Sequence, residues 1–201
     1  DVLSPDFTQA VCDQPAAIEA VQFYTDLAAK YKVTPEIALT ANTEQMDGLF
    51  VAGKLAVHLT GQYIRPNLQQ NAPNLKWAAH STIKRQQIPG PLGGWNWVIP
   101  KGAKNADAAG TLVNFMAQPQ NMADIADKIG VFPSRKTALQ DPRFKDPLLA
   151  PFAEQLTYAR ATPPIQQWAD VQKAFVGGVQ SVIAGQGSVQ DAMKQAAADI
   201  N

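Results

Sequence analysis

The sequence predicts an α/β chain that is rich in helices and contains only a few short strands. Apolar residues recur at spacings of three or four over several long stretches, which is the period of one helix face. Three other runs are short, compact and rich in β-branched or aromatic side chains: Leu55–Leu59, Lys76–His80 and Trp95–Ile99. These runs are too few for two complete sheets, so helices carry most of the predicted fold.

The first half of the chain is expected to alternate helices with these strands. Pro15 suits the first turn of a helix over residues 15–31. A shorter helix over residues 44–52 ends at Gly53, since glycine readily adopts the left-handed conformation that closes a helix. A further helix begins near Tyr63, just after the first predicted strand.

The second half is expected to be almost entirely helical. Asn105 is the predicted cap of a helix over residues 105–117, and Pro119 begins another that ends before Gly130. Ala109, Leu112, Val113 and Met116 form the expected apolar stripe of the first of these helices. Further helices are predicted over residues 147–158, over residues 168–183 and from the cap Ser188 onward.

Charge and composition exclude several functions. Lys+Arg and Asp+Glu number 17 each, and no basic run occurs, so nucleic acid is not an expected partner. The sequence has no phosphate loop, zinc helix or nucleophile elbow, and the two histidines lack metal-pair spacing. We therefore expect neither a cofactor nor a metal. The single cysteine, Cys12, is expected to be a small buried side chain. A glycosidase stays an alternative here, because a linear sequence cannot place two carboxylates across a cleft.

Four segments carry a resemblance to a known family. They are Asp47–Gly61, with its Gly-Lys and strand; Gly93–Lys101, with its glycines and tryptophans; Ala108–Gly130 followed by Phe132-Pro-Ser134; and Val176–Ile200. In this order they resemble the C-terminal half of the large extracellular solute-binding proteins of ABC importers, the maltose-binding and glycerol-phosphate-binding kind. The resemblance covers nearly the whole chain.

The resemblance implies the helix-rich part of a two-lobe fold of the periplasmic-binding-protein type II-like class, without the N-terminal part of the first lobe. It implies that residues 1–90 belong to the second lobe, residues 91–145 cross the hinge into the first, and residues 146–201 return to the second. The implied function is capture of a sugar or oligosaccharide between the lobes and its delivery to the membrane subunits of an ABC permease. The protein would then be periplasmic or an extracellular membrane-anchored protein, and not an enzyme.

Two alternatives remain open within this interpretation. The ligand can be glycerol phosphate rather than a sugar, and the chain can be a single-domain, all-helical interaction module. A fragment of a two-lobe protein is also expected to self-associate, because it exposes apolar surface that meets the other half in the intact protein.

The resemblance also implies which residues contact the ligand. A sugar site combines aromatic plates for the C–H faces with amides, carboxylates and guanidinium groups for the hydroxyls. The expected ligand residues are Gln62, Tyr63, Gly93, Gly94, Trp95, Arg160 and Trp168. The alternatives are a tight turn at the glycines, a surface helix start at Tyr63 and a core position for Trp168. Arg65, Glu44 and Asp47 are expected mainly as solvated charges, and Trp77 as a core residue.

Overall fold

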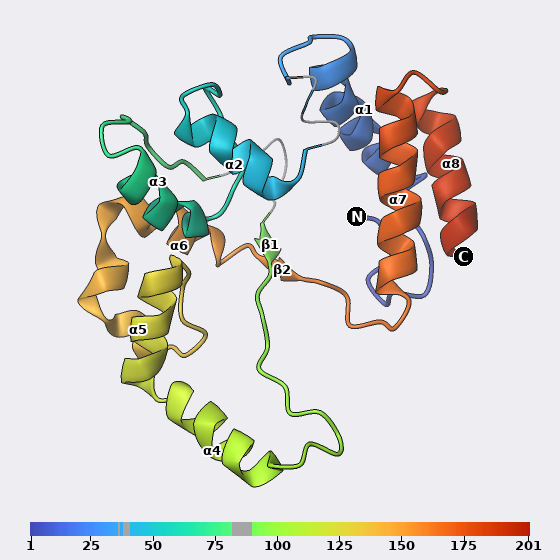
Figure 1. Cartoon of the computed structure of the whole chain (residues 1–201). Coiled ribbons are helices and arrows are strands. Elements are labelled where there is room, and N and C mark those ends of the chain that lie inside the picture. The colour runs from blue at the N-terminus through green and yellow to red at the C-terminus, as the bar shows by residue number, and fades with distance from the viewer. Residues whose placement is uncertain (36, 38–40, 82–89) are drawn as a thin grey trace. The chain divides into compact units, whose positions relative to one another are not determined.

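The computed structural model describes residues 1–35, 37, 41–81 and 90–201. Backbone contacts divide the chain into two compact units (Figure 1). The terminal unit consists of Asp1–Glu44 and Pro163–Asn201, and the central unit consists of Gln45–Thr162. The predicted lobe boundaries concern the intact two-lobe protein, so they stay a prediction.

The terminal unit is a small helical layer. It contains α1 (Pro15–Ala29), α7 (Trp168–Ile183) and α8 (Val189–Ile200), with α7 and α8 side by side in Figure 1. Cys12 and Met193 are fully buried at the centre of its core, which confirms the expectation for the cysteine. The N-terminal loop is tied to the other end of the chain, since the backbone N–H of Ala10 donates to Oδ1 of Asn201 at 2.9 Å.

The central unit is built from short helices and one small parallel sheet. Its core is formed by Ala123, Ala126, Ala138 and Phe144. Phe132 packs edge-on against Phe144, with 6.3 Å between the ring centroids. In chain order, its elements are α2 (Thr43–Val51, which begins in the terminal unit), η2 (Gln62–Ile64), α3 (Arg65–Asn71), β1 (Pro91–Leu92), α4 (Ala106–Met116), α5 (Pro119–Ile129), η3 (Ala138–Gln140), η4 (Pro142–Lys145), η5 (Pro147–Leu149), α6 (Ala150–Gln155) and β2 (Arg160–Ala161).

The predicted helices are confirmed, with ends shifted by a few residues. Pro15 occupies the first turn of α1, and the Ser188 hydroxyl accepts a hydrogen bond from the backbone N–H of Asp191 at the start of α8. Gly53 and Gly130 have φ angles of +69° and +74° where their helices end. Asn105 precedes α4 as predicted, but its side chain makes no capping hydrogen bond.

The three predicted strands are wrong. Leu55–Leu59, Lys76–His80 and Trp95–Ile99 are irregular in the structure, and the only ladder among the described residues pairs β1 with β2. A strand exists only when its N–H and C=O groups bond to a neighbour. Within the residues that the structure describes, none of these segments has such a neighbour, although their side chains suit a strand.

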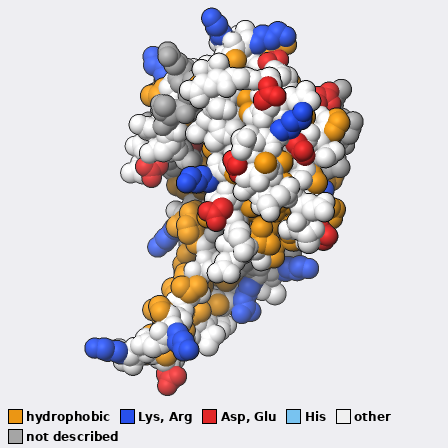
Figure 2. Space-filling model, turned by 90° about the vertical axis from the view of Figure 1, so that its right-hand side faces the viewer, with side chains coloured by type: hydrophobic (Ala, Val, Ile, Leu, Met, Phe, Trp, Pro, Cys, Tyr) orange, Lys and Arg blue, Asp and Glu red, His pale blue; other side chains and the backbone are white. Residues whose placement is uncertain are grey.

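Helix α4 is largely open to solvent. It has no buried residue, and its predicted inward stripe is partly open, with Leu112 56% exposed. Phe115 is 63% exposed on the same helix, and Val98 in the preceding segment is 76% exposed. Figure 2 shows hydrophobic side chains along the lower part of the molecule, where Figure 1 draws α4 and that segment. An apolar surface of this kind is typical of an interface.

Two arginines connect the helices of the central unit through four aspartates. Arg65 is 9% exposed, and its guanidinium lies 3.0 Å from Asp127 and 3.8 Å from Asp146. Arg143 lies 2.8 Å from Asp124 on α5 and holds Asp141 with two hydrogen bonds of 2.9 and 2.8 Å. This cluster joins α3, α5 and the turns before α6. The expectation that Arg65 is solvated is wrong, because the aspartates surround it.

The Arg143–Asp141 pair is expected to make the central unit sensitive to acid. Hydrogen bonds from the Arg143 side chain lower the pKa of Asp141 from its ordinary value of 3.8 to about 2. Because the pKa is lower in the folded chain, this pair stabilises the fold above pH 4, and the contribution disappears as the pH falls through about 2. Urea unfolding at a series of pH values between 2 and about 6 measures the slope.

The Arg143→Gln variant is expected to lose stability at neutral pH and to show a flatter dependence between about pH 4 and pH 2. The same substitution at the exposed Arg135 is the matched control and should leave the slope unchanged. An identical slope in Arg143→Gln and the unaltered chain would show that Asp141 does not contribute.

Candidate ligand-binding site

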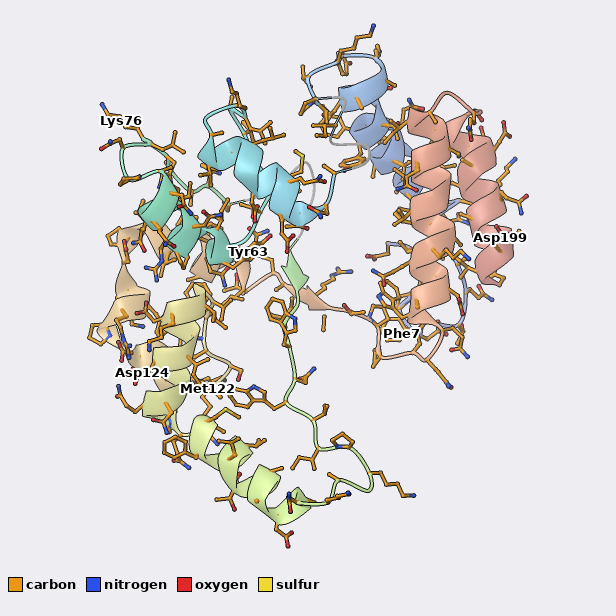
Figure 3. The ribbon with its side chains drawn as sticks, in the orientation of Figure 1. Phe7, Tyr63, Lys76, Met122, Asp124 and Asp199 are labelled. Atoms are coloured by element: carbon orange, nitrogen blue, oxygen red, sulfur yellow. The ribbon has the colours of Figure 1, made fainter. Side chains whose placement is uncertain are left out.

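Tyr63 and Gln62 form the short 3-10 helix η2 that leads into α3 (Figure 3). Tyr63 is 39% exposed, and Gln62 is half-buried. The ring of Tyr63 lies against Gly61, so closely that a Cβ on Gly61 would stand 2.7 Å from Cε1 of the ring. Only a glycine leaves room for this arrangement. Tyr63 is thus an exposed aromatic side chain whose ring packs against Gly61.

Gly93, Gly94 and Trp95 follow strand β1 directly. Strand β1 pairs in parallel with β2, with Pro91 opposite Arg160 and Leu92 opposite Ala161, and the backbone N–H of Arg160 donates to the carbonyl of Gly90 at 2.8 Å. The pairing brings Arg160 beside the start of the glycine segment, although the two are far apart in the sequence. Both glycines are exposed, with open space where a side chain would be.

The two tryptophans of this segment differ in exposure. Trp95 is 87% exposed and Trp97 is 46% exposed. Trp95 is the more open of the two, and its contact with a ligand stays a prediction. Trp77, which was expected in the core, is only half-buried.

Trp168 begins α7 in the terminal unit and is half-buried, so it is neither a core residue nor a free plate. It belongs to a different unit from the other six candidates. The terminal unit also has an open groove along α7 and α8, and Gly177 and Gly178 are among the residues that line it. None of the candidate ligand residues lines this groove.

The structure adds a polar cluster that the sequence analysis missed. Asp47, expected as an exposed helix charge, is 9% exposed on α2. Its Oδ1 lies 2.7 Å from Nε2 of His58 and 3.4 Å from the Thr60 hydroxyl, and Thr60 lies 3.1 Å from the Tyr63 hydroxyl. The available sequence signal was a carboxylate and a histidine on either side of the Gly53 turn.

The described residues contain neither a metal-binding cluster nor a membrane-spanning helix. Among those described, no three His, Cys, Asp or Glu side chains lie together in a way that could hold a metal ion. None of the helices in the described ranges is long and apolar enough to cross a bilayer.

The profile of one family covers most of the chain. The family described as bacterial extracellular solute-binding protein matches residues 3–151. This chain belongs to that family. The description names its members as extracellular proteins that bind solutes. The fold of this chain is part of a two-lobe fold of the periplasmic-binding-protein type II-like class, which agrees with the family.

Relatives of known sequence or structure agree with the family. A binding protein of Brucella abortus (strain 2308) is 26% identical over 98% of this chain. A solute-binding protein of Thermotoga lettingae TMO, solved with α-D-tagatose, is 26% identical and superposes on 100% of this chain with a TM-score of 0.91. The MalE3 protein of T. maritima, solved with maltose, is 25% identical over 100% of the chain with a TM-score of 0.82.

The matches also show how much of a solute-binding protein this chain represents. It covers 48% of the Brucella protein, 52% of the Thermotoga lettingae chain and 53% of the MalE3 chain. The chain therefore spans about half the length of the relatives that it matches.

Proposed function

We propose that the intact protein captures a sugar or oligosaccharide between two lobes and delivers it to the membrane subunits of an ABC permease. The observation that carries the proposal is the pair of exposed aromatic side chains in the central unit, Tyr63 and Trp95. A polar residue accompanies each of them. Gln62 precedes Tyr63 in the sequence. Arg160 lies on β2, which pairs with the strand just before the segment of Trp95. The tagatose and maltose of the two solved relatives support a carbohydrate ligand.

Exposure of a tryptophan side chain to water is unfavourable. A tryptophan that is 87% exposed leaves a large apolar face in water, and its burial against a ligand is favourable. The C–H face of a sugar ring is apolar and flat enough to stack on such a plate. Gly93 and Gly94 allow a ligand to approach the backbone before Trp95, because no side chain occupies that space.

The engagement of Arg65 favours a sugar over glycerol phosphate. A phosphate would call for converging arginine or lysine side chains. The guanidinium of Arg65 is instead committed to Asp127 and Asp146. Arg65 therefore offers no uncommitted guanidinium to a phosphate.

The proposal assigns residues 1–90 and 146–201 to the second lobe and residues 91–145 to the hinge and the first lobe. The ligand then shifts the equilibrium between open and closed lobes toward the closed form, because it binds the closed form better. Val57 and Leu59 are 84% and 78% exposed, and the open face of α4 adds to them. These exposed apolar side chains support cover by the other half of a protein of about double length, and self-association of the chain alone. The family description supports a location in the periplasm or on the outer side of the membrane.

The test compares the intact protein with this chain and with one tryptophan variant. Calorimetric titration with maltose, tagatose and glycerol 3-phosphate is expected to show sugar binding by the intact protein and none by this chain. In the intact protein, Trp95→Ala is expected to weaken sugar binding by about 10- to 100-fold, since a stacking plate is lost.

Trp97→Ala is the matched control, since Trp97 is the less exposed neighbour; we expect it to change the affinity by less than about threefold. Binding of glycerol 3-phosphate alone would replace the sugar with a phosphate ester as the ligand. A parent protein no longer than this chain would contradict the two-lobe proposal and favour an interaction module.

A further inference from the structure

A buried ion pair joins helices α3 and α5. Arg65, the first residue of α3, is 9% exposed, and its Nη2 donates a hydrogen bond to Oδ1 of Asp127 at 3.0 Å. Asp127 lies on α5, 62 positions further along the chain. The carboxylate of Asp146 lies 3.8 Å from Nη1 of the same guanidinium. Arg65 is therefore held between segments that are distant in the sequence.

Close packing accompanies the ion pair. A Cβ on Gly130, at the end of α5, would stand 2.6 Å from Cδ of Pro66 and 3.2 Å from Cα of Tyr63. The end of α5 thus lies directly against the turn that carries Tyr63. Figure 3 labels Tyr63 on η2 and Asp124 on α5, the two elements that meet at this point.

This contact crosses the proposed boundary between the lobes. The proposed function assigns residues 1–90 to the second lobe and residues 91–145 to the hinge and the first lobe, so Arg65 and Asp127 belong to different lobes. Asp146 belongs to the second lobe, together with Arg65. The hydrogen bond from Arg65 to Asp127 then exists only while the two lobes lie together here.

Arg65 combines one favourable contact with one unfavourable one. A hydrogen bond between a guanidinium and a carboxylate is stronger than a bond between neutral groups. Nε of Arg65, however, is buried and has no hydrogen-bond partner among the described residues, and burying such a donor is costly. Separation of α3 from α5 would break the bond to Asp127 and let water reach Nε. The pair therefore favours the closed arrangement without making it irreversible.

We propose that the Arg65–Asp127 pair is a latch that stabilises the closed form of the intact protein. The inference rests on the proposed function, in which the lobes close around a sugar. A latch raises the affinity for any ligand that binds the closed form, because a larger fraction of the protein is then ready to bind it. Arg65 is thus a positioning residue that acts through closure and does not contact the sugar.

Calorimetric titration of the intact protein with maltose and tagatose tests the latch. Arg65→Gln removes the charge and is expected to weaken the binding of both sugars by about three- to tenfold. The two losses are expected to agree within about twofold, because the latch changes the equilibrium between open and closed lobes and not the contacts of either sugar.

Arg143→Gln is the matched control. Arg143 lies 2.8 Å from both Asp124 and Asp141, and all three residues belong to residues 91–145. Loss of this ion pair destabilises the fold but breaks no contact across the proposed boundary, so the sugar affinity is expected to stay within about twofold. Equal losses of affinity in Arg65→Gln and Arg143→Gln would mean that general destabilisation weakens binding, and would overturn the latch.

Asp127→Asn removes the other charge of the pair while keeping the size of the side chain. It is expected to weaken binding as Arg65→Gln does, and the double variant is expected to lose no more than the larger single loss. Additive losses would overturn the latch. Asp127 also lies 3.9 Å from Arg143, and the Arg143→Gln control accounts for that contact. Thermal unfolding shows whether each variant folds, and Asp127→Asn decides if Arg65→Gln does not.

The outcomes also separate this inference from the proposed function. Unchanged affinity for both sugars in Arg65→Gln and Asp127→Asn overturns the latch and leaves sugar capture standing. A loss for one sugar alone would make Arg65 a ligand contact and would overturn the latch as well. An intact protein that binds neither sugar overturns the proposed function, and the latch with it.

Discussion

Replacing Gly130 with alanine is expected to destabilise the central unit by about 2–4 kcal/mol. Gly130 ends α5 with a φ of +74°, a conformation that costs an alanine about 1–2 kcal/mol. A Cβ there would also stand 2.6 Å from Cδ of Pro66 and 3.2 Å from the Tyr63 Cα, so α3 and α5 would have to separate. Urea unfolding of the chain measures the loss.

Gly102→Ala is the matched control for this prediction. Gly102 has a φ of +85° in the same unit, but nothing lies within 4 Å of the position that its Cβ would occupy. This variant is expected to lose only the conformational cost of about 1–2 kcal/mol. The difference between the two variants measures the contact of Gly130 with Pro66 and Tyr63. Equal losses would show that the contact is relieved without cost.

Met193→Ala is expected to cost the terminal unit about 3 kcal/mol. Met193 is 0% exposed and belongs to the cluster that joins α1, α7 and α8. Its terminal methyl fills the space beside Gly178, where a Cβ would stand 2.8 Å from Cε of Met193. Truncation to alanine removes these contacts and leaves a cavity that two packed helices close only in part. Urea unfolding followed by circular dichroism measures the change.

The same substitution on α4 provides the comparison. Met116 lies on a helix that has no buried residue, so Met116→Ala is expected to cost less than about 1 kcal/mol. Losses of the same size at both positions would contradict the view that the α7–α8 interface is the close-packed core of the terminal unit.

The helices could be predicted from the sequence because their signals are local. Pro15, Ser188 and Gly130 mark helix ends through hydrogen bonds and conformations that involve residues only a few positions away. The family resemblance depended on the same kind of information, in the form of ordered short motifs. The profile match over residues 3–151 confirms it.

The strands could not be predicted in the same way. Leu55–Leu59 has the composition of a strand, yet the described part of the chain offers it no partner. The pair that does form joins Pro91 to Arg160, two positions with no strand signal of their own. A strand forms only where a neighbouring segment supplies hydrogen-bond partners, and that segment is often distant in the sequence.

The sequence by itself determined the helices, the family and the residue types of the candidate site, including Tyr63 and Trp95. Only the tertiary structure decided which polar groups act on them. It buried Asp47 beside His58 and Thr60, and it surrounded Arg65 with Asp127 and Asp146. The physical reason is that a side chain's burial and partners depend on contacts between distant segments: Arg65 and Asp127 stand 62 positions apart. Periodicity and capping carry no information about such contacts.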